Sequence, residues 1–321
     1  MSVSVSGSTF ARAAWVAAAL ATAALPHVAR SGQADPFAFF GHLVRLDRSD
    51  RERLDRGDVL VRVLPAHDGE LAVFAASRLE APAEALVSWT REIEQLKTSR
   101  FAPLVRRFSN PPVLDDLRDL ALDETDMQAI RQCRVGRCDV KLLDSEIARL
   151  RAAGTAGGAE GYDATQHEFR RIVLDRVLAD RSPDIVDMLA GYPPIEVSTV
   201  ESFFYWSKEQ YGAGKKVVTV THVTIARPVP SSGPAVVVLG REIFATHYRT
   251  ASLGLTAVVD DRASDRRYLV YVNRTDVDVL GGLFGGLKRV VIEARIKGES
   301  EQLIKGVRDR LESGLRGEVS S

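Results

Sequence analysis

Two histidines have the side-chain type for acid/base catalysis or metal binding: His222, in Thr-His-Val-Thr, and His247, in Thr-His-Tyr. Both fall in stretches predicted to pair as an antiparallel hairpin, in a register that sets His222 opposite Ile243. His247 then lies four residues further along, about 13 Å away at the rise of a strand, which is too far for a shared metal. We therefore expect no metal and no other cofactor. His222, His247 and Tyr248 remain separate candidates to line a cavity or to meet solvent.

Patterns typical of established catalytic nucleophiles are missing from the sequence. It contains no G-x-S-x-G elbow, no H-E-x-x-H metalloprotease helix and no S-x-x-K pair. The sequence therefore does not support an enzyme. A cyclase- or hydrolase-like activity that uses His222, His247 or Tyr248 is kept as a third hypothesis.

Four consecutive aromatic residues, 203–206, form the most aromatic stretch of the chain. Side chains alternate between the two faces of a strand, so some of the four should reach the core and some should meet another part of the protein. Aromatic rings with tyrosine hydroxyls suit an apolar ligand with a polar head, whereas ordinary core packing explains the same residues without a ligand. The candidates for a cavity wall are therefore Phe204 and Trp206, Tyr271 on the last strand and Phe284 near the final helix.

The segment C-R-V-G-R-C places the two cysteines, Cys133 and Cys138, at the ends of a short loop in which Gly136 allows a turn. We expect a disulfide that staples this loop, at the low end of the roughly 2–4 kcal/mol that such bonds contribute, because a short loop removes little entropy. A redox-active pair and half of a metal site are the alternatives. Redox proteins usually present C-x-x-C at a helix N-terminus, and no further Cys or His lies nearby at zinc-finger spacing.

Residues 1–34 have the pattern of a secretory signal peptide. Arg12 precedes an apolar run of about 13 residues, Ala13 to Leu25, which is shorter than the roughly 20 residues that span a bilayer. Small residues then precede two potential cleavage sites, after Ala34 or after Ala23, and we favour Ala34. A buried Ala-rich helix and an uncleaved anchor are the alternatives.

Composition agrees with an exported, soluble bacterial protein. Arginine far outnumbers lysine and alanine is abundant, which is typical of a GC-rich genome, and a cysteine pair fits an oxidising compartment. We expect the periplasm of a Gram-negative bacterium, or secretion. Basic and acidic residues number 43 each, so no net charge would attract nucleic acid or an anionic membrane.

Periodicity predicts three regions after the signal peptide. Residues 35–101 carry a short helix with a Ser49–Glu52 capping box and an end at Gly57, then a hairpin over 59–64 and 71–79 and a helix over 83–97. Residues 102–193 carry only helical signals, at 112–120, 123–132, 144–152 and 164–180, with a flexible loop over 153–161. Residues 194–315 return to strands and then a long helix: 195–206, 216–226, 235–249, 252–260, 267–273 and 279–311.

The order of these elements, with 102–193 set aside, resembles the helix-grip fold of START and polyketide-cyclase-like proteins. Two stretches carry the resemblance, Ala72 to Leu96 (AVFAASRLEAPAEALVSWTREIEQL) and Tyr271 to Leu287 (YVNRTDVDVLGGLFGGL). They are similar to that family's second strand with the helix behind it, and to its last strand with the Gly-rich entry to the gripping helix. The resemblance implies an α+β fold in which a curved antiparallel sheet grips a long C-terminal helix, here with a helical insertion.

Members of that family bind sterols, phospholipids or other apolar ligands, and the resemblance implies a cavity between sheet and helix without a shared catalytic residue. We therefore expect an exported protein that binds a hydrophobic small molecule or lipid, with at most transient contact with a membrane. The 102–193 insertion would cap the cavity or bind a partner protein. The alternative function is a periplasmic interaction module that docks its partner through this insertion and has no ligand pocket.

Overall fold

The computed structural model describes residues 35–318 except for short stretches at 135–136, 182–184, 190, 211–213, 230–232 and 279–284. The expected signal peptide and the cavity candidate Phe284 lie outside the described residues. Residues from Asp35 onward pack as one unit. Among the described residues, no helix combines the length and the apolar character needed to cross a bilayer.

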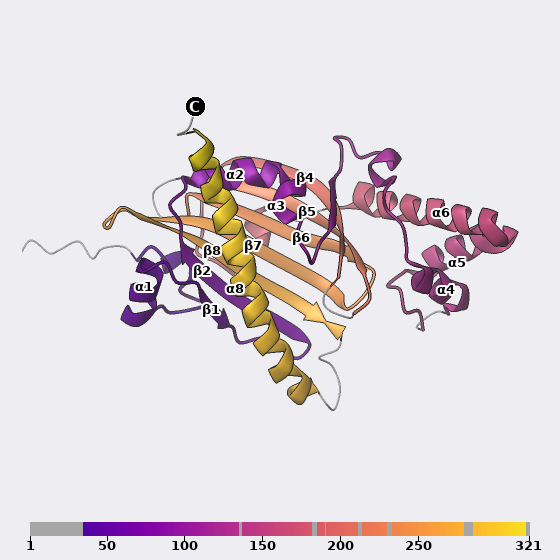
Figure 1. The fold of residues 1–321 in the computed structure, drawn as a ribbon, viewed down its shortest axis with the longest axis horizontal. Coiled ribbons are helices and arrows are strands. Elements are labelled where there is room, and N and C mark those ends of the chain that lie inside the picture. The colour runs from indigo at the N-terminus through magenta and orange to yellow at the C-terminus, as the bar shows by residue number, and fades with distance from the viewer. Residues whose placement is uncertain are drawn as a thin grey trace, which may run out of the picture. The chain divides into compact units, whose positions relative to one another are not determined.

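Eight strands form one antiparallel sheet in the order β1-β2-β8-β7-β6-β5-β4-β3 (Figure 1). Their bounds are Leu60–Val63 (β1), Glu70–Arg78 (β2), Leu104–Arg107 (β3), Val197–Glu209 (β4), Val217–Pro228 (β5), Val236–Ala245 (β6), Arg249–Asp261 (β7) and Arg266–Val277 (β8). Pairing of β2 with β8 joins the N-terminal hairpin to the C-terminal meander. Strands β1 and β3 remain at the edges, so the sheet is not closed. The predicted α+β class with an antiparallel sheet is confirmed.

Alternation along each strand gives the sheet two different faces. In β4, Phe203 and Tyr205 belong to one hydrophobic core, whereas Trp206 belongs to a second core and Phe204 packs against it. The four aromatic residues therefore divide between the faces as their spacing predicts.

One face of the sheet packs against three helices, α2 (Ala83–Arg91), α3 (Ile93–Lys97) and α8 (Gly285–Glu318). Ile304 and Leu311 of α8 are each 1% exposed and share a core with Tyr205 of β4 and with residues of α2 and α3. We call this the α8 side of the sheet. Its core is apolar along the middle of the strands and gives way to polar residues toward one end.

The opposite face is covered at one end by the first residues after Asp35. These form a 3-10 turn η1 (Ala38–Phe40) and a short helix α1 (Arg48–Asp55). Phe40 is fully buried and packs edge-on against Phe74 of β2, in a core that also contains Val237 and Val270 from the central strands. The middle residues of the central strands are therefore buried on this face.

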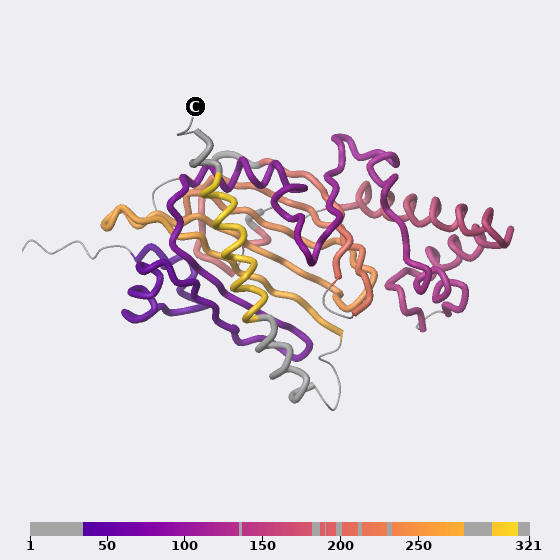
Figure 2. The backbone as a smooth tube through the Cα atoms, in the orientation of Figure 1, coloured from indigo at the N-terminus to yellow at the C-terminus, as the bar shows by residue number. Residues whose placement is uncertain are grey.

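The helical segment between β3 and β4 lies at the other end of the strands (Figure 2). Its apolar residues share a core with Trp206 and Phe244, which lie on the face away from α8. Its elements are η2 (Leu114–Leu117), α4 (Glu124–Gln132), α5 (Asp144–Ala153), η3 (Gly154–Ala156), α6 (Gly158–Ala179) and α7 (Ile185–Met188). Phe169 of α6 is fully buried in one core with Trp206 of β4 and Phe244 of β6. The insertion therefore shares its core with the face of the sheet that lies away from α8.

Three local predictions are wrong. The segment 102–193 was expected to be helical throughout, but β3 lies within it as an edge strand paired with β4. The loop over 153–161 contains η3 and the first turn of α6, which begins six residues earlier than predicted. Asp47, not Ser49, is the N-cap of α1, because its carboxylate accepts a hydrogen bond from the Asp50 amide.

The predicted register of the β5–β6 hairpin is also wrong. His222 pairs with Arg241 rather than with Ile243, because a bulge between Val220 and Thr221 shifts the pairing and leaves Ile243 without a partner position. His247 lies beyond the end of β6, in the turn that leads into β7, rather than on a strand.

Candidate functional site

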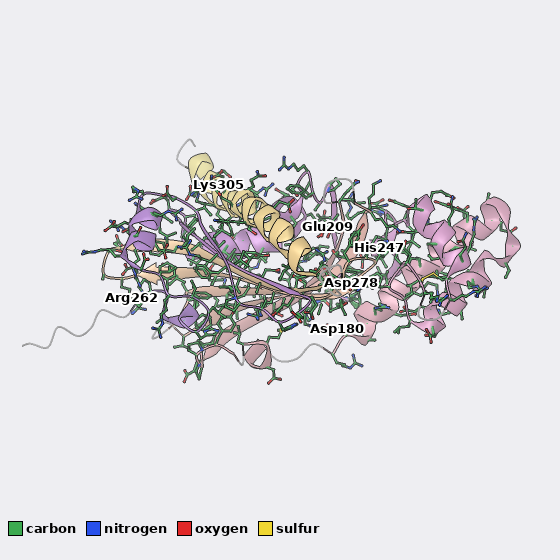
Figure 3. The ribbon with its side chains drawn as sticks, turned by 90° about the horizontal axis from the view of Figure 1, so that it is seen from below. Asp180, Glu209, His247, Arg262, Asp278 and Lys305 are labelled. Carbon is green, nitrogen blue, oxygen red and sulfur yellow. A yellow bond between two sulfur atoms is a disulfide. The ribbon has the colours of Figure 1, made fainter. Side chains whose placement is uncertain are left out.

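Polar side chains from five neighbouring strands meet on the α8 side at one end of the sheet. Alternation places each of them on the same face as Tyr205, Val223 or Tyr271, and the register sets them beside one another. We call this set the polar belt: Ser207, Glu209, Thr219, Glu242, Arg249, Ser252, Asn273 and Thr275. Figure 3 shows Glu209 on the side of the sheet that carries α8 and Asp180 on the other side.

Arg249 is the centre of the polar belt. Its Nη2 lies 3.0 Å from Oε2 of Glu209 and 3.0 Å from Oε2 of Glu242, so one guanidinium serves two carboxylates. Ser207 donates a second hydrogen bond to Glu209, at 2.9 Å, and its hydroxyl lies 2.8 Å from that of Thr219. The ions are largely buried, with side-chain exposures of 8% for Glu209, 9% for Glu242 and 20% for Arg249.

The two carboxylates differ in their protonation. Burial alone would raise the pKa of Glu209, but Arg249, Lys97 and the hydrogen bond from Ser207 outweigh it and leave that pKa below its ordinary value. Burial dominates at Glu242, and Glu209 adds repulsion, so the pKa of Glu242 rises to about 7 despite Arg249 and Lys97. Glu209 is therefore ionised, whereas Glu242 exchanges a proton near neutral pH.

A second hydrogen-bonded chain continues the polar belt onto β7 and β8. Thr275 donates to Oδ1 of Asn273 at 2.7 Å, Asn273 donates to Ser252 at 3.3 Å, and the hydroxyls of Ser252 and Thr275 lie 2.8 Å apart. Ser252 is the cross-strand partner of Glu242, so this chain adjoins the carboxylate pair. Donors and acceptors thus cover the end of this face.

Next to the polar belt, the α8 side is partly accessible even on its central strands. Gly240 and Gly254 are cross-strand partners, and a Cβ atom built on either would meet its neighbours only at ordinary contact distances of 3.5 Å or more. Tyr271 beside them is partly exposed as a whole residue. Its hydroxyl is buried, and this burial raises its pKa. On the opposite face, Leu239 and Leu255 of the same strands are 1% and 2% exposed. At this level of the sheet, these strands are therefore more exposed on the α8 side than on the opposite face.

The structure separates His222 from this site. His222 lies on the opposite face, where Nδ1 is 3.0 Å from Oδ2 of Asp180, which follows α6, and Phe204 stacks on its ring at 4.2 Å. Arg241 pairs with the other oxygen of Asp180. Burial lowers the pKa of His222, and the hydrogen bond with Asp180 offsets this only in part. The group joins the insertion to the middle of the sheet.

His247 makes a second junction with the insertion. Its side chain is 3% exposed, with Nε2 3.0 Å from Oδ1 of Asp126 in α4 and Nδ1 2.8 Å from the Asp139 carbonyl. Tyr248, next in the chain, has a positive φ of 64° and accepts a hydrogen bond from the Lys215 amide. Both ring nitrogens of His247 thus contact oxygen atoms of the insertion, and these contacts hold the turn after β6 against the insertion.

The residues predicted to line one cavity divide between two faces of the sheet. Tyr271 lies on the α8 side, whereas Phe204, Trp206 and His222 lie on the opposite face, and Trp206 donates its indole N–H to the Asp116 carbonyl in the insertion. The predicted disulfide between Cys133 and Cys138 is present, with Cα atoms 4.5 Å apart.

The polar belt was not predicted from the sequence. Its signal was available in two strand-interior glycines, Gly240 and Gly254, because glycine inside a strand often marks a place where a ligand or another backbone approaches. Among the described residues, no group of three or more His, Cys, Asp and Glu side chains is arranged to hold a metal ion.

Comparison with protein families and with curated proteins finds no match to this chain. Its chemistry is therefore argued from the geometry of the polar belt.

Proposed function

We propose that the protein binds a hydrophobic small molecule or lipid with a polar head, held between the sheet and the helices of the α8 side. The apolar body would lie along the middle strands, near Tyr205, Val238 and Tyr271. The head would face the polar belt, where Glu242 and Arg249 offer an exchangeable proton and a guanidinium. No reaction is needed to explain this arrangement.

The asymmetry between the two faces of the central strands carries this proposal. Central strands covered by layers on both sides are normally buried on both. On the face away from α8, the middle residues of β6, β7 and β8 are buried, and partial exposure begins only toward one end, at Arg241, Leu253 and Arg274. On the α8 side, Gly240, Gly254, Thr256, Tyr271 and Asn273 all keep partial exposure. A pocket lined by apolar and aromatic residues with a few convergent polar groups is the usual form of a small-molecule site.

The connectivity supports a START-like helix-grip fold for the site. The sheet begins with β1 and β2, passes to β8 and ends at β3, while two short helices follow β2 and a long helix follows β8. This is the order in which the START-like fold builds a curved sheet around its C-terminal helix. In this proposal, the fold places the ligand under α8, and the insertion lies outside the site.

Export to an oxidising compartment is the proposed location. The disulfide between Cys133 and Cys138 agrees with it, since such bonds persist in secreted and periplasmic proteins. The signal peptide over 1–34, a Gram-negative source and transient contact with a membrane on ligand delivery belong to the same proposal.

The first experiment is to express the full chain with its own signal in an oxidising bacterial periplasm and weigh the purified protein by native mass spectrometry. A stoichiometric bound compound, identified after extraction, is the expected result. A clean mass without a ligand, together with no binding of added apolar probe, would favour the alternative in which the 102–193 insertion docks a partner protein.

A matched pair of variants locates the site. Gly254→Leu would project a side chain into the space beside Tyr271, and Gly298→Leu adds the same atoms at an exposed position of α8. Fluorescence titration with the neutral probe N-phenyl-1-naphthylamine should show at least tenfold weaker binding to the Gly254→Leu variant and unchanged binding to the Gly298→Leu variant. Equal binding to both would place the ligand elsewhere.

A further inference from the structure

A cavity in the insertion is lined only by residues of the insertion. It is an open pocket with a volume of about 360 Å³, lined by residues of α4, α5, η3 and the first turns of α6. That volume falls in the range of pockets that hold small molecules, which begins at about 300 Å³. The polar belt contributes nothing to its lining, so the cavity is independent of the proposed function.

The inner wall of this cavity is apolar. Met127, Ile130 and Leu150 line it, and each is only 1–2% exposed because it also belongs to the core that joins the insertion to the sheet. These side chains are held by α4 and α5, so the wall is built from regular structure. It would accept the apolar body of a ligand.

Two arginines line the same cavity from these helices, Arg131 near the end of α4 and Arg151 near the end of α5. Both arginines are exposed, and within the described part of the chain neither guanidinium forms an ion pair or a hydrogen bond. No acidic residue lines the cavity. Two other arginines of the insertion are paired, since Arg149 pairs with Glu168 and Asp175 and Arg176 pairs with Glu146. The positive charge at this cavity thus has no acidic counterpart in its lining.

A rim of glycines leaves backbone uncovered beside the arginines. Gly157 and Gly158 have φ angles of 73° and 54°, and nothing lies within 4 Å of a Cβ built on either. Gly161 packs so closely on η3 that a Cβ would lie 3.0 Å from the Gly154 carbonyl oxygen. The glycines therefore permit both the turn into α6 and open access to the cavity.

We infer that this cavity binds a small organic oxyanion, a phosphate or carboxylate carried on a short apolar body. Guanidinium groups present paired N–H donors that match the oxygens of phosphate and carboxylate, and Arg131 and Arg151 supply them above an apolar wall. Each arginine also lies in the last turn of its own helix, where its positive charge interacts favourably with the negative end of the helix dipole. Stabilisation of the helix ends would affect folding alone and would require no ligand. A binding measurement therefore distinguishes this structural role from oxyanion binding.

The test is a titration of the full, disulfide-bonded chain with octyl phosphate, followed by calorimetry and by the amide resonances of Gly154, Gly157, Gly158 and Gly161. Saturable binding with shifts at these glycines is expected, with octanol and inorganic phosphate each binding at least tenfold more weakly. Raising the salt concentration should weaken binding, because two ionic contacts are involved.

Variants decide whether the arginines act on the ligand. The double variant Arg131→Gln/Arg151→Gln should bind octyl phosphate at least tenfold more weakly while unfolding at the same urea concentration as the wild type. Arg118→Gln is the matched control, since Arg118 is 72% exposed in the same insertion and does not line the cavity. Its affinity should equal that of the wild type.

Two outcomes would overturn the inference: no saturable binding of either octyl phosphate or phosphatidic acid vesicles to the wild type, or equal affinities for the wild type and the double variant. If octyl phosphate fails but vesicles of phosphatidylcholine with phosphatidic acid bind in an arginine-dependent way, the same oxyanion chemistry belongs to a lipid headgroup. The Gly254→Leu variant should retain the glycine shifts, so failure here and failure of the sheet–helix site remain distinguishable.

Discussion

Buried charges are handled differently on the two faces of the sheet. On the insertion side, Asp126 meets His247 of the turn after β6, and Asp180 meets His222 and Arg241 of the strands. Each contact joins a residue of the insertion to the strands or to the turn between them. On the α8 side, Glu209 and Glu242 come from two strands of the same sheet and share Arg249. The first arrangement joins two parts of the fold, whereas the second gathers charge at one place within a single part.

This difference predicts different effects of substitutions on the two faces. A buried ion pair across a junction makes the two parts depend on each other, since loss of either partner leaves the other charge uncompensated. The two carboxylates around Arg249 lie within one sheet, so they do not join separate parts of the fold. The pKa of one of them, Glu242, is about 7, which places it near its protonation midpoint at neutral pH. We therefore expect substitutions on the insertion side to change stability, and substitutions in the polar belt to change pH dependence and binding.

The largest effect should come from Asp126→Ala. Asp126 and His247 are 6% and 3% exposed, so the variant leaves a buried imidazole without its carboxylate and should lose about 3–5 kcal/mol of unfolding free energy, measured in urea. Asp119→Ala is the control, since Asp119 and its partner Arg106 are more than 40% exposed and should contribute less than about 1 kcal/mol. Similar losses in both variants would remove the distinction between the junction and the surface.

The next effect concerns pH. The folded pKa of Glu242 is raised to about 7 from 4.5, so between these values the folded protein holds a proton that the unfolded chain has released. Stability should therefore fall as pH rises through this window, by on the order of 3 kcal/mol, and Glu242→Gln should remove the decline. Urea unfolding from pH 5 to pH 8 checks this, and parallel curves for the wild type and the variant would contradict it.

Glu209 should affect the pH dependence of stability in the opposite direction, which the Glu209→Gln variant tests. The pKa of Glu209 is lowered, so its ionised form stabilises the fold above its unfolded pKa, and that contribution is lost only as pH falls below about 4.5. The variant should therefore be less stable than the wild type at pH 7. It should show a smaller decline of stability between pH 5 and pH 8, because Glu209 no longer raises the pKa of Glu242 by repulsion.

The smallest effect should come from the disulfide. Cys133 and Cys138 are five positions apart, so replacing both by alanine relaxes only a short loop and should cost about 2 kcal/mol, with the polar belt and its pH dependence unchanged. Thermal unfolding and the pH series of the double variant measure this. A changed pH dependence would show that the loop influences the α8 side after all.

The sequence predicted the strands of the C-terminal meander and the N-terminal hairpin because their Val- and Thr-rich alternation is local. It did not predict β3, whose four residues include Arg106 and Arg107 and whose pairing with β4 lies about 100 residues away in the chain. The start of α6 was missed because its glycines read as a loop, although Gly157 and Gly158 supply the positive φ angles of the turn into the helix.

The candidate site was hidden for a related reason. Glu209 and Glu242 look like ordinary solvent-facing residues of two strands, and only the bulged register of β4, β5 and β6 brings them within reach of Arg249. Conversely, the aromatic composition of 203–206 suggested a cavity wall, yet two of the four residues pack in the core shared with the insertion. Composition identifies unusual residues, whereas pairing between distant strands decides which of them meet.

The hydrogen bonds of Asn273 have a consequence for protein production. Asn273-Arg274-Thr275 is an acceptor sequence for N-linked glycosylation, but it lies within β8, where the Asn273 amide donates to Ser252 and Arg274 pairs with Glu70. A glycan attached before folding would occupy the α8 side of the sheet and prevent β8 from packing. A eukaryotic secretory host would therefore divide the chains into unmodified, folded molecules and modified molecules that fail quality control, and Asn273→Gln would raise the yield there.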